Sequence, residues 1–502
     1  MKLGMRYAMM LRVAFILTIL LFCPTAKAQD PTCGLLNDPA IHVAPHYAQP
    51  SEAHYDGSQL SPPASIGGTY VDPVYGCTIK RLTNGPVEWN SPAIHEYSNM
   101  SAINSNDTLI EIGTNSGWAI LDPSGNVIVP VGNVPYTTGR WDITQPNVVY
   151  YLSGSGLEKG TVNTSGCAPN CMITQTTLHA FSEYSSMSFG GGEGDLFSPD
   201  HILLYGVRAS DSTQDIFVYT ISTDTQGPVF NFPADTQFDN AEITGSNQMV
   251  VNWGHDQSPL GTCSSGPCFT GFELFGAACN GVGCSPANAS YVRHLSDTHS
   301  HSVESRDTNG NDVVVAFDAY PRTPGCASQG DGGIVTIRVS DGTITCILAG
   351  TPWASTVHVG TSRFLTGTNW IVLSTEDSSD PIGNGTDSTS YPLNPNWYLP
   401  TTANNTPSAA GQWGHLSNDT YVMNLDGSKL YRVYQSRSRP GASDYWKASR
   451  ACMSRDGRYI VFDSDYGIGQ NTPVNDYVDV YIVNVGVVRP APPTLLQVIS
   501  VH

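Results

Sequence analysis

The segment Thr-His-Ser-His at 298–301 places two imidazoles, those of His299 and His301, two residues apart. Alternate side chains of a β-strand point to the same side, so these two rings would stand next to each other. Paired imidazoles suit a divalent cation such as Mn, Zn or Ca. His358 is the candidate third ligand, with Glu304 or Glu242 as alternatives. In the competing interpretation no metal binds, and the histidines face water or form hydrogen bonds with neighbouring strands.

A metal site of this kind suits β-elimination on a uronate. In that reaction the cation and an arginine neutralise the substrate carboxylate, and a base removes the neighbouring proton. Four side chains are candidates for these roles: His95, Tyr97, Lys447 and Arg450. The structural alternative is that Lys447 and Arg450 form salt bridges with acids such as Asp444 or Glu96.

Other catalytic signatures are weak or absent in the sequence. It contains no Gly-x-Ser-x-Gly, no His-Glu-x-x-His and no phosphate-binding loop before a helix. The run Gly190-Gly191-Gly192-Glu193-Gly194-Asp195 enters a predicted strand, so close backbone packing explains its glycines better than nucleotide binding does. Glu193 and Asp195 remain a weaker candidate pair of hydrolytic carboxylates.

The candidate residues are distant in sequence, so the fold must bring them together. Only 13% of residues are charged, the chain has 49 Gly and 34 Pro, and no long segment shows an apolar period of 3.6 residues. Short β-rich runs separated by polar turns recur about seven times, at roughly 45 to 65 residues each. This pattern predicts an all-β fold, a seven-bladed β-propeller.

The predicted blades fall at about 88–132, 133–182, 183–233, 234–297, 298–350, 351–436 and 444–488. The last of them lacks an outer strand, and Tyr75–Leu82 reads as a strand without partners. We therefore expect this N-terminal strand to pair with the last blade and close the ring. Two long insertions, at about 255–270 and 376–415, are candidate walls of a binding site.

The innermost strand of each blade lines the central channel of a propeller. The polar side chains of these predicted strands should therefore converge on one axis. They are His95-Glu96-Tyr97, Arg140-Trp141-Asp142, Glu193 and Asp195, Asp239 and Glu242, His299 and His301, His358, and Lys447 and Arg450.

Residues 1–28 are typical of a signal peptide, because cations precede a short apolar run and Ala26-Lys27-Ala28 offers a cleavage site. We expect an exported protein with an irregular lead at 29–66, a propeller at 67–486 and a Pro-rich tail at 487–502. No other segment approaches the ~20 apolar residues of a membrane span. Removing four cations with the signal changes the formal charge from −20 to −24, which disfavours nucleic acid and polyanionic partners.

Eleven cysteines remain after that cleavage, many as close pairs. In an oxidising compartment, close pairs indicate disulfides that staple loops. The expected pairs are 167/171, 263/268 and 279/284, and 326/346 and 33/77 can also pair, leaving Cys452 over. A zinc site is the alternative, but the usual Cys-x2-Cys spacing is absent.

Two segments, 421–428 (Tyr-Val-Met-Asn-Leu-Asp-Gly-Ser) and 454–462 (Ser-Arg-Asp-Gly-Arg-Tyr-Ile-Val-Phe), resemble blades of TolB-type propellers. The resemblance covers most of residues 70–486. A narrower similarity, carried by the His-rich channel, is to the oligogalacturonate lyases. These are seven-bladed propellers that hold a divalent metal with histidines near the channel.

Two functions are compatible with this resemblance. The first is an exported carbohydrate-active protein, most concretely a metal-dependent polysaccharide lyase with a Mn, Zn or Ca ion and no organic cofactor. The second is a non-catalytic TolB-like scaffold that binds a protein or a glycan. In both cases we expect a monomer whose ligand is a neutral or uronate-containing glycan or a protein.

Overall fold

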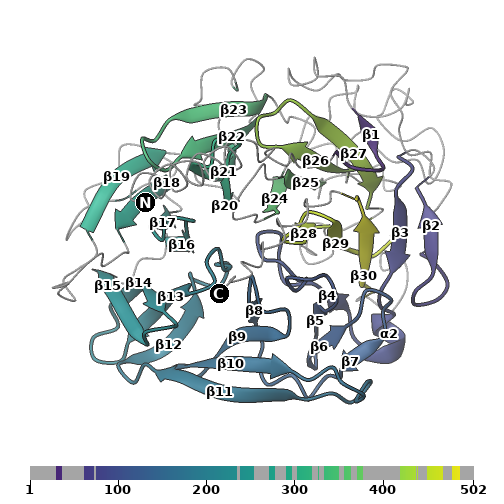
Figure 1. Ribbon diagram of the computed structural model, residues 1–502, viewed down its shortest axis with the longest axis horizontal. Helices are drawn as coiled ribbons and strands as arrows, with labels where there is room; N and C mark the ends of the chain where they lie inside the picture. The colour runs from purple at the N-terminus through teal and green to yellow at the C-terminus, as the bar shows by residue number, and fades with distance from the viewer. Residues whose placement is uncertain are drawn as a thin grey trace, which may run out of the picture.

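The seven sheets of the protein are arranged as blades around a central axis (Figure 1). The computed structural model describes residues 30–36, 62–72, 75–233, 238–253, 269, 271–276, 290–296, 302–318, 326, 333–349, 356–362, 370–376, 419–436, 438, 449–466 and 477–486. Within these ranges the only α-helix is α2 (Gly85–Glu88), and no helix is long and apolar enough to cross a membrane. The predicted all-β, seven-bladed propeller is confirmed.

The first three blades are regular four-stranded sheets with the strands in sequence order. The first contains β4 (Ala93–Ile94), β5 (Ile110–Thr114), β6 (Gly117–Leu121) and β7 (Val127–Val129). The second contains β8 (Gly139–Trp141), β9 (Val148–Ser153), β10 (Gly156–Val162) and β11 (Ile173–Ala180). The third contains β12 (Tyr184–Phe189), β13 (His201–Arg208), β14 (Gln214–Thr220) and β15 (Thr225–Phe232).

The next three blades repeat this order, and the sixth gains an extra edge strand. The fourth contains β16 (Phe238–Ile243), β17 (Met249–Trp253), β18 (Gly271–Gly276) and β19 (Ser290–Ser296). The fifth contains β20 (Ser302–Arg306), β21 (Asp312–Asp318), β22 (Gly333–Arg338) and β23 (Ile344–Ala349). The sixth contains β24 (Thr356–Thr361), β25 (Trp370–Glu376), β26 (Asp419–Asn424), β27 (Leu430–Gln435) and the edge strand β1 (Leu35–Leu36).

The seventh blade is completed by the N-terminal part of the chain. Its own strands are β28 (Cys452–Met453), β29 (Tyr459–Ser464) and β30 (Asp479–Asn484). β3 (Thr78–Arg81) pairs antiparallel with β30, and β2 (Thr69–Val71) lies outside β3. The predicted ring closure by an N-terminal strand is therefore confirmed, whereas the pairing of β1 with the sixth blade was not foreseen.

Three of the expected disulfides are present: Cys33–Cys77, Cys167–Cys171 and Cys326–Cys346. Cys452 is a buried free thiol, as its place as the leftover cysteine predicts. The pairs 263/268 and 279/284 lie outside the described residues. Disulfides persist in oxidising compartments, so the three bonds fit an exported protein.

The hydrophobic core is divided among the seven interfaces between neighbouring blades. Each of seven apolar clusters joins one blade to the next. The two faces of a middle strand pack against the blades on either side and are both buried. Its residues are therefore continuously apolar, for example Val-Val-Val-Ala-Phe at 313–317. Polar side chains therefore lie at the central axis and at the two faces of the ring.

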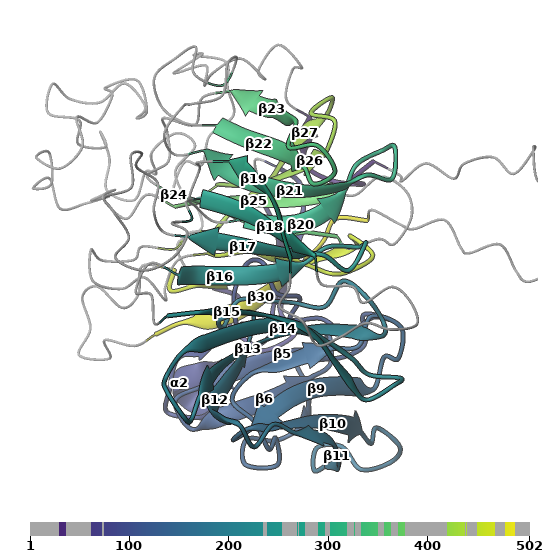
Figure 2. The same cartoon turned by 90° about the vertical axis from the view of Figure 1, so that its left-hand side faces the viewer.

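The direction of the strands defines these two faces. The first strand of each blade runs one way and the second returns (Figure 2). We call the face where the first strands begin the front face and the opposite one the back face. The second strands β17, β21, β25 and β29 end at the front face. The predicted insertions 255–270 and 376–415 depart from strands that end there, and apart from residues 269 and 376 they lie outside the described residues.

Candidate functional site: the polar axis

A segment of the first blade leaves its strand at the axis. Ile94 pairs with Gly113 and Ile103 with Ile110, so the eight residues 95–102 stand opposite only two, 111 and 112. The extra residues cannot remain in the ladder and bend away from the sheet. We call residues 95–101 the crossing segment, because their side chains and backbone contact most of the other blades.

The first residues of the crossing segment bind charged groups of the flanking blades. The imidazole of His95 lies 2.8 Å from Asp463 on β29 through Nδ1, and its Nε2 lies 2.7 Å from the carbonyl oxygen of Arg450. Glu96 forms an ion pair of 2.6 Å with Arg140 on β8. These contacts tie the first blade to the seventh and to the second.

The remaining contacts of the crossing segment reach across the axis. Tyr97 meets His358 on β24 edge to face, with 5.6 Å between ring centroids. Asn99 donates a hydrogen bond of 3.3 Å to Glu242 on β16, and the backbone N–H of Ser101 donates one of 3.1 Å to Asp195 of the third blade. Five of the six other blades are thus in contact with one short segment.

Arg450 and Asp463 complete a buried cluster with His95, Tyr97 and His358. A nitrogen of Arg450 lies 3.1 Å from the Asp463 carboxylate, and its guanidinium carbon lies 5.9 Å from the centre of the Tyr97 ring. Arg450 has a φ of 37°, a backbone conformation that a non-glycine residue adopts only under constraint. His95, His358 and Arg450 are 0% exposed. Three consecutive blades around the ring closure supply this cluster.

Burial determines the charge state of His358. Desolvation, reinforced by electrostatic interactions with Arg450 and His95, lowers the pKa of His358 to about 3. The ring is therefore neutral at physiological pH, which is the form of imidazole that binds metals.

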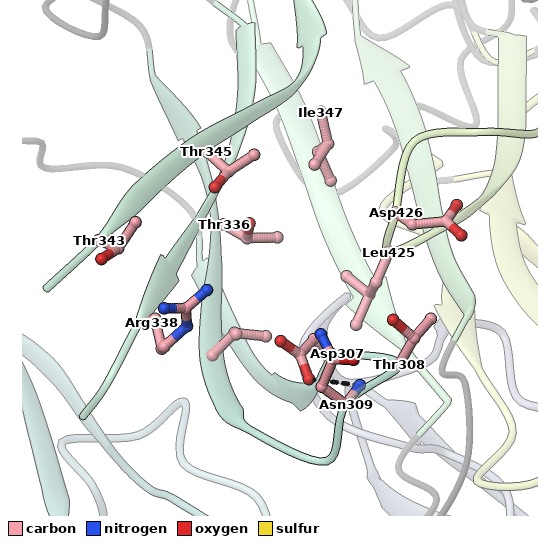
Figure 3. Close-up of a pocket in the computed structure, with 11 residues that line it drawn as sticks. Asp307, Thr308, Asn309, Thr336, Arg338, Thr343, Thr345, Ile347, Leu425 and Asp426 are labelled. Carbon is pink, nitrogen blue, oxygen red and sulfur yellow. Dashed lines mark hydrogen bonds between the residues drawn. The ribbon is translucent and has the colours of Figure 1, made fainter. Parts of the chain in front are cut away.

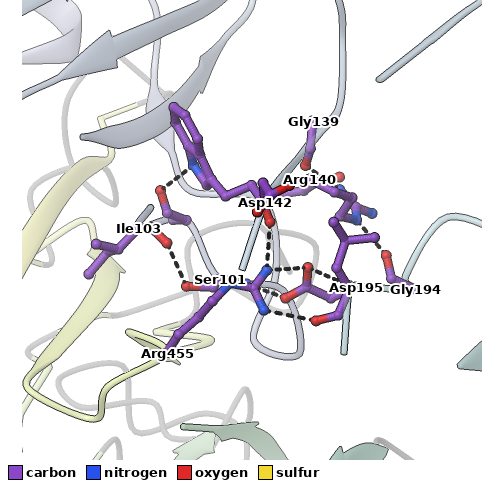
Figure 4. Close-up of polar contacts among 12 residues, drawn as sticks. Ser101, Ile103, Gly139, Arg140, Asp142, Gly194, Asp195 and Arg455 are labelled. Atoms are coloured by element: carbon purple, nitrogen blue, oxygen red, sulfur yellow. Dashed lines mark hydrogen bonds and ion pairs between the residues drawn. The ribbon is translucent and has the colours of Figure 1, made fainter. Parts of the chain in front are cut away.

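A second polar network lies on the other side of the crossing segment (Figure 4). Arg455 pairs with Asp195 at 2.9 Å and donates hydrogen bonds to the carbonyl oxygens of Leu196 and Trp141. Arg140 binds Glu96 and, through its Nη2, the carbonyl oxygen of Gly192. Two arginines thus join the second, third and seventh blades by binding backbone oxygens as well as carboxylates.

Three carboxyl groups near the axis have raised pKa values. Burial and the neighbouring Glu96 raise the pKa of Glu111 to about 8. Burial and Asp239 raise the pKa of Glu193 to about 7. Burial also raises the pKa of Glu96, against the opposing effect of Arg140. At neutral pH Glu111 is therefore mostly protonated and Glu193 is protonated in about half of the molecules.

The weaker hypothesis of a carboxylate pair at Glu193 and Asp195 gains no support from their contacts. Glu193 accepts a hydrogen bond from Asn240, whereas Asp195 binds Arg455 and Ser101. The run Gly190–Asp195 does not enter a strand as predicted, because it follows β12 and lies in the connection to β13. Its glycines nevertheless have the predicted packing role. A Cβ at Gly190 would lie 1.9 Å from the carbonyl oxygen of Ala241, and Gly190 has a φ of +51°.

Of the candidate site residues, the structure brings His95, Tyr97, His358 and Arg450 into one cluster. His299, His301 and Lys447 lie outside the described residues. Within the described part of the chain Arg450 pairs with Asp463, and Glu96 pairs with Arg140. Sequence reasoning missed Asp463 and Arg455, because the first lies on a second strand and the second in an ordinary-looking Arg-Asp-Gly turn.

The described residues alone do not form a metal site. No group of three or more His, Cys, Asp or Glu side chains among them has the arrangement to hold an ion. His358 offers one neutral imidazole, and Arg450 beside it opposes a cation held by His358 alone. A divalent ion would therefore depend on ligands such as His299 and His301.

Comparison with known proteins identifies the fold. No protein-family model and no curated protein matches the sequence. Among solved structures, an oligogalacturonate lyase in complex with manganese aligns at 10% identity and a TM-score of 0.50, over 83% of this chain and 95% of that one. An oligogalacturonate lyase from Vibrio parahaemolyticus aligns at 11% and 0.49, over 83% and 96%, and TolB from Acinetobacter baumannii at 11% and 0.32, over 68% and 63%. The fold is shared with the first of these structures. At 10% identity the similarity extends no further, and it confirms the propeller architecture that the sequence resemblance implied.

Proposed function

We propose that this chain is an exported carbohydrate-active propeller, most concretely a metal-dependent polysaccharide lyase that acts at the front face of the channel. The observation that carries the proposal is the cluster of His95, Tyr97, His358 and Arg450, to which three adjacent blades contribute. The likeness to an oligogalacturonate lyase solved with manganese supports this class of reaction.

The proposed metal ligands are His299, His301 and His358. Residues 299 and 301 immediately precede β20. This strand lies beside β24, which carries His358, because Ser305 near the end of β20 is 3.0 Å from Thr361 at the end of β24. A Mn, Zn or Ca ion held there would neutralise the substrate carboxylate. Of these three proposed ligands, only His358 lies within the described residues, and its neutral imidazole fits a metal ion.

The burial of the cluster divides the proposed roles. His95 and Arg450 have no exposed surface, so we assign them to holding Tyr97 and His358 in place. Tyr97 retains 6% of its surface, and together with Lys447 it is the proposed source of the base. The formal charge of −20 favours a neutral or sparsely charged glycan over a dense polyanion.

The test combines metal analysis with a product assay. The purified mature protein is analysed for metals and incubated with pectic and ulvan-type oligomers, and unsaturated products are followed by ultraviolet absorbance. We expect about one divalent ion per chain, and we expect His299→Ala to remove both the ion and the product. His179→Ala is the matched control, because His179 lies on β11, the outermost strand of its blade, and pairs with Asp224.

The alternative function is a non-catalytic scaffold for a protein or glycan. The crossing segment favours it, because its side chains His95, Glu96 and Asn99 are already paired with groups of other blades. A metal-free protein that forms no product, and that loses glycan or protein binding only when residues 376–415 are shortened, would support the scaffold and exclude the lyase.

A further inference from the structure

A polar cavity lies between the fifth and sixth blades, away from the axis (Figure 3). Its volume is about 230 Å³. Three turns surround it: Asp307–Gly310 between β20 and β21, the turn between β22 and β23, and the turn that follows β26 at Leu425 and Asp426. All three turns lie on the back face, because each follows a first or third strand of its blade. The cavity is therefore separate from the proposed site at the front face.

One wall of the cavity is a set of aligned polar side chains. Thr336 pairs directly with Thr345, and the N–H of Arg338 bonds to the carbonyl oxygen of Thr343. Residues two apart on a strand, and their direct cross-strand partners, share one face of the sheet. Thr336, Arg338, Thr343 and Thr345 therefore project together into the cavity, as Figure 3 shows.

The floor is apolar and firmly held. It is formed by Val313, Ile347 and Leu425, which belong to the core cluster between the two blades. The turn from the sixth blade lies close to the fifth: a Cβ at Gly427, whose φ is +71°, would lie 2.7 Å from the carbonyl oxygen of Ile347. This packing fixes the distance between the two walls before any ligand arrives.

Two threonine hydroxyls of the wall are available to a ligand. The Thr343 side chain bonds to Asp341, whereas within the described residues no side-chain hydrogen bond involves the hydroxyl of Thr336 or Thr345. Arg338 is paired with Asp341 at 3.0 Å through Nη1, while its Nε is buried and has no hydrogen-bond partner among the described residues. Donors and acceptors thus face a small cavity in which only water or a ligand can satisfy them.

The chemistry of the lining selects a neutral, hydroxyl-rich ligand. Threonine hydroxyls both donate and accept hydrogen bonds, as sugar hydroxyls do. The carboxylates of Asp307 and Asp426 oppose an anion, and Arg338 opposes a free cation. The volume is below the roughly 300–1,000 Å³ of cavities that bury drug-sized ligands, so it suits a single ring with its apolar side on the aliphatic floor.

We propose that this cavity is a second, non-catalytic subsite that binds one neutral sugar unit of a glycan on the back face. The choice of a sugar as ligand rests on the carbohydrate function proposed above, whereas the existence of the site rests on the cavity and on the free hydroxyls of Thr336 and Thr345.

The test measures binding of neutral gluco-, galacto- and xylo-oligosaccharides to the full chain by calorimetry and ligand-observed NMR. The variant is Thr343→Val combined with Thr345→Val. Both residues are exposed, so the substitutions remove two hydroxyls and keep the β-branched shape without disturbing the core. The matched control is Thr176→Val, an exposed threonine on β11.

We expect at least one neutral oligosaccharide to bind the unmodified chain, the double variant to bind it at least fivefold more weakly, and the control to match the unmodified chain. Equal affinity in the double variant, or absence of binding to every neutral oligosaccharide, overturns the subsite. Tighter binding of acidic oligogalacturonate than of neutral sugars, if it is weakened by the same double variant, overturns the neutral-ligand assignment. His299→Ala separates the two proposals, since it should abolish product formation and leave this binding intact.

Discussion

Glu111 is a single carboxyl group whose burial makes the stability of the whole protein depend on pH. Its ordinary pKa is 4.5, and in the folded chain burial and Glu96 raise the pKa to about 8. Between these two values the unfolded chain has released the proton and the native chain still holds it. The native state then binds more protons, so stability falls as pH rises from about 4.5 to about 8.

Replacement of Glu111 by Gln should remove this contribution. The amide keeps the shape of the protonated acid and does not titrate, so the loss of stability between pH 5 and pH 8 should become shallower by up to about 1.4 kcal/mol per pH unit. Denaturant unfolding at several pH values measures the slope. Glu158→Gln on β10, whose carboxylate bonds to Thr177 at the surface, is the control. An unchanged slope in Glu111→Gln would show that Glu111 is ionised in the native protein.

Sequence reasoning at this scale predicted residue types better than partners. His95, Tyr97, His358 and Arg450 were recognised as axial groups, because ionisable residues are unusual on strands that pack on both sides. Asp463 was missed although it binds His95, since the two are 368 residues apart and only the closed ring brings them together. A pair at such a separation leaves no local pattern.

The crossing segment is the element that most distinguishes this channel from a simple ring of strands. His95-Glu96-Tyr97 was predicted to lie on the inner strand of the first blade. The three residues lie at the axis as expected, but they follow β4 (Ala93–Ile94) and are not part of a strand. Its departure from the sheet depends on the register with β5, where eight residues oppose two. Register depends on the partner strand and on the residues that the segment contacts across the axis. Neither can be predicted from the sequence of the segment itself.

Gly360 on β24 gives a way to test how firmly the crossing segment is held. A Cβ at this position would lie 2.5 Å from the carbonyl oxygen of Ser98 and 2.9 Å from a methyl group of Val372. Gly360→Ala should force the segment away from β24 and cost about 1–3 kcal/mol of the free energy of unfolding. Chemical denaturation measures the loss.

The matched control for that substitution is Gly156→Ala, where the added methyl group would meet no atom closer than 3.3 Å. Equal stabilities of the two variants would mean that Ser98 moves freely and that the axis is not closed by a rigid segment. A selective loss in Gly360→Ala would show that opening the channel has an energetic cost, which any ligand entering between Tyr97 and His358 would have to overcome.

At the scale of the whole molecule, counting blades was enough to predict the ring and its closure. The predicted C-terminal blade has too few strands, and a predicted strand near the N-terminus has no partner. Pairing the two removes both open edges, which are unfavourable. The Cys33–Cys77 disulfide at the seam was among the predicted pairs, whereas the ion pair across the seam was not predicted. Arg81 and Asp479 form a buried ion pair of 2.6 Å across the seam, with the two side chains 6% and 0% exposed.

The seam is held by this ion pair and by the Cys33–Cys77 disulfide, and the two should not act independently. Removing one partner of a buried pair, as in Arg81→Gln, should cost about 3–5 kcal/mol. Removing the disulfide, with a sequence separation of 44 residues, should cost about 4 kcal/mol by the loop-entropy estimate. Both secure β3 against the last blade: Arg81 directly, and the disulfide through Thr32, whose N–H bonds to the carbonyl oxygen of Val485.

Each of the two interactions stabilises the protein only while β3 is paired with the last blade. If the loss of one allows β3 to detach, loss of the other has little further effect on stability. The combined variant should therefore lose less stability than the sum of the separate losses, by about 0.5–3 kcal/mol in a double-mutant cycle of denaturant unfolding. Lys429→Gln is the surface control, because its ion pair with Asp30 is exposed on both sides. Strict additivity of the two seam variants would mean that β3 does not open separately and that the ring unfolds only as one cooperative unit. In that case the seam would not be the place where the propeller first opens.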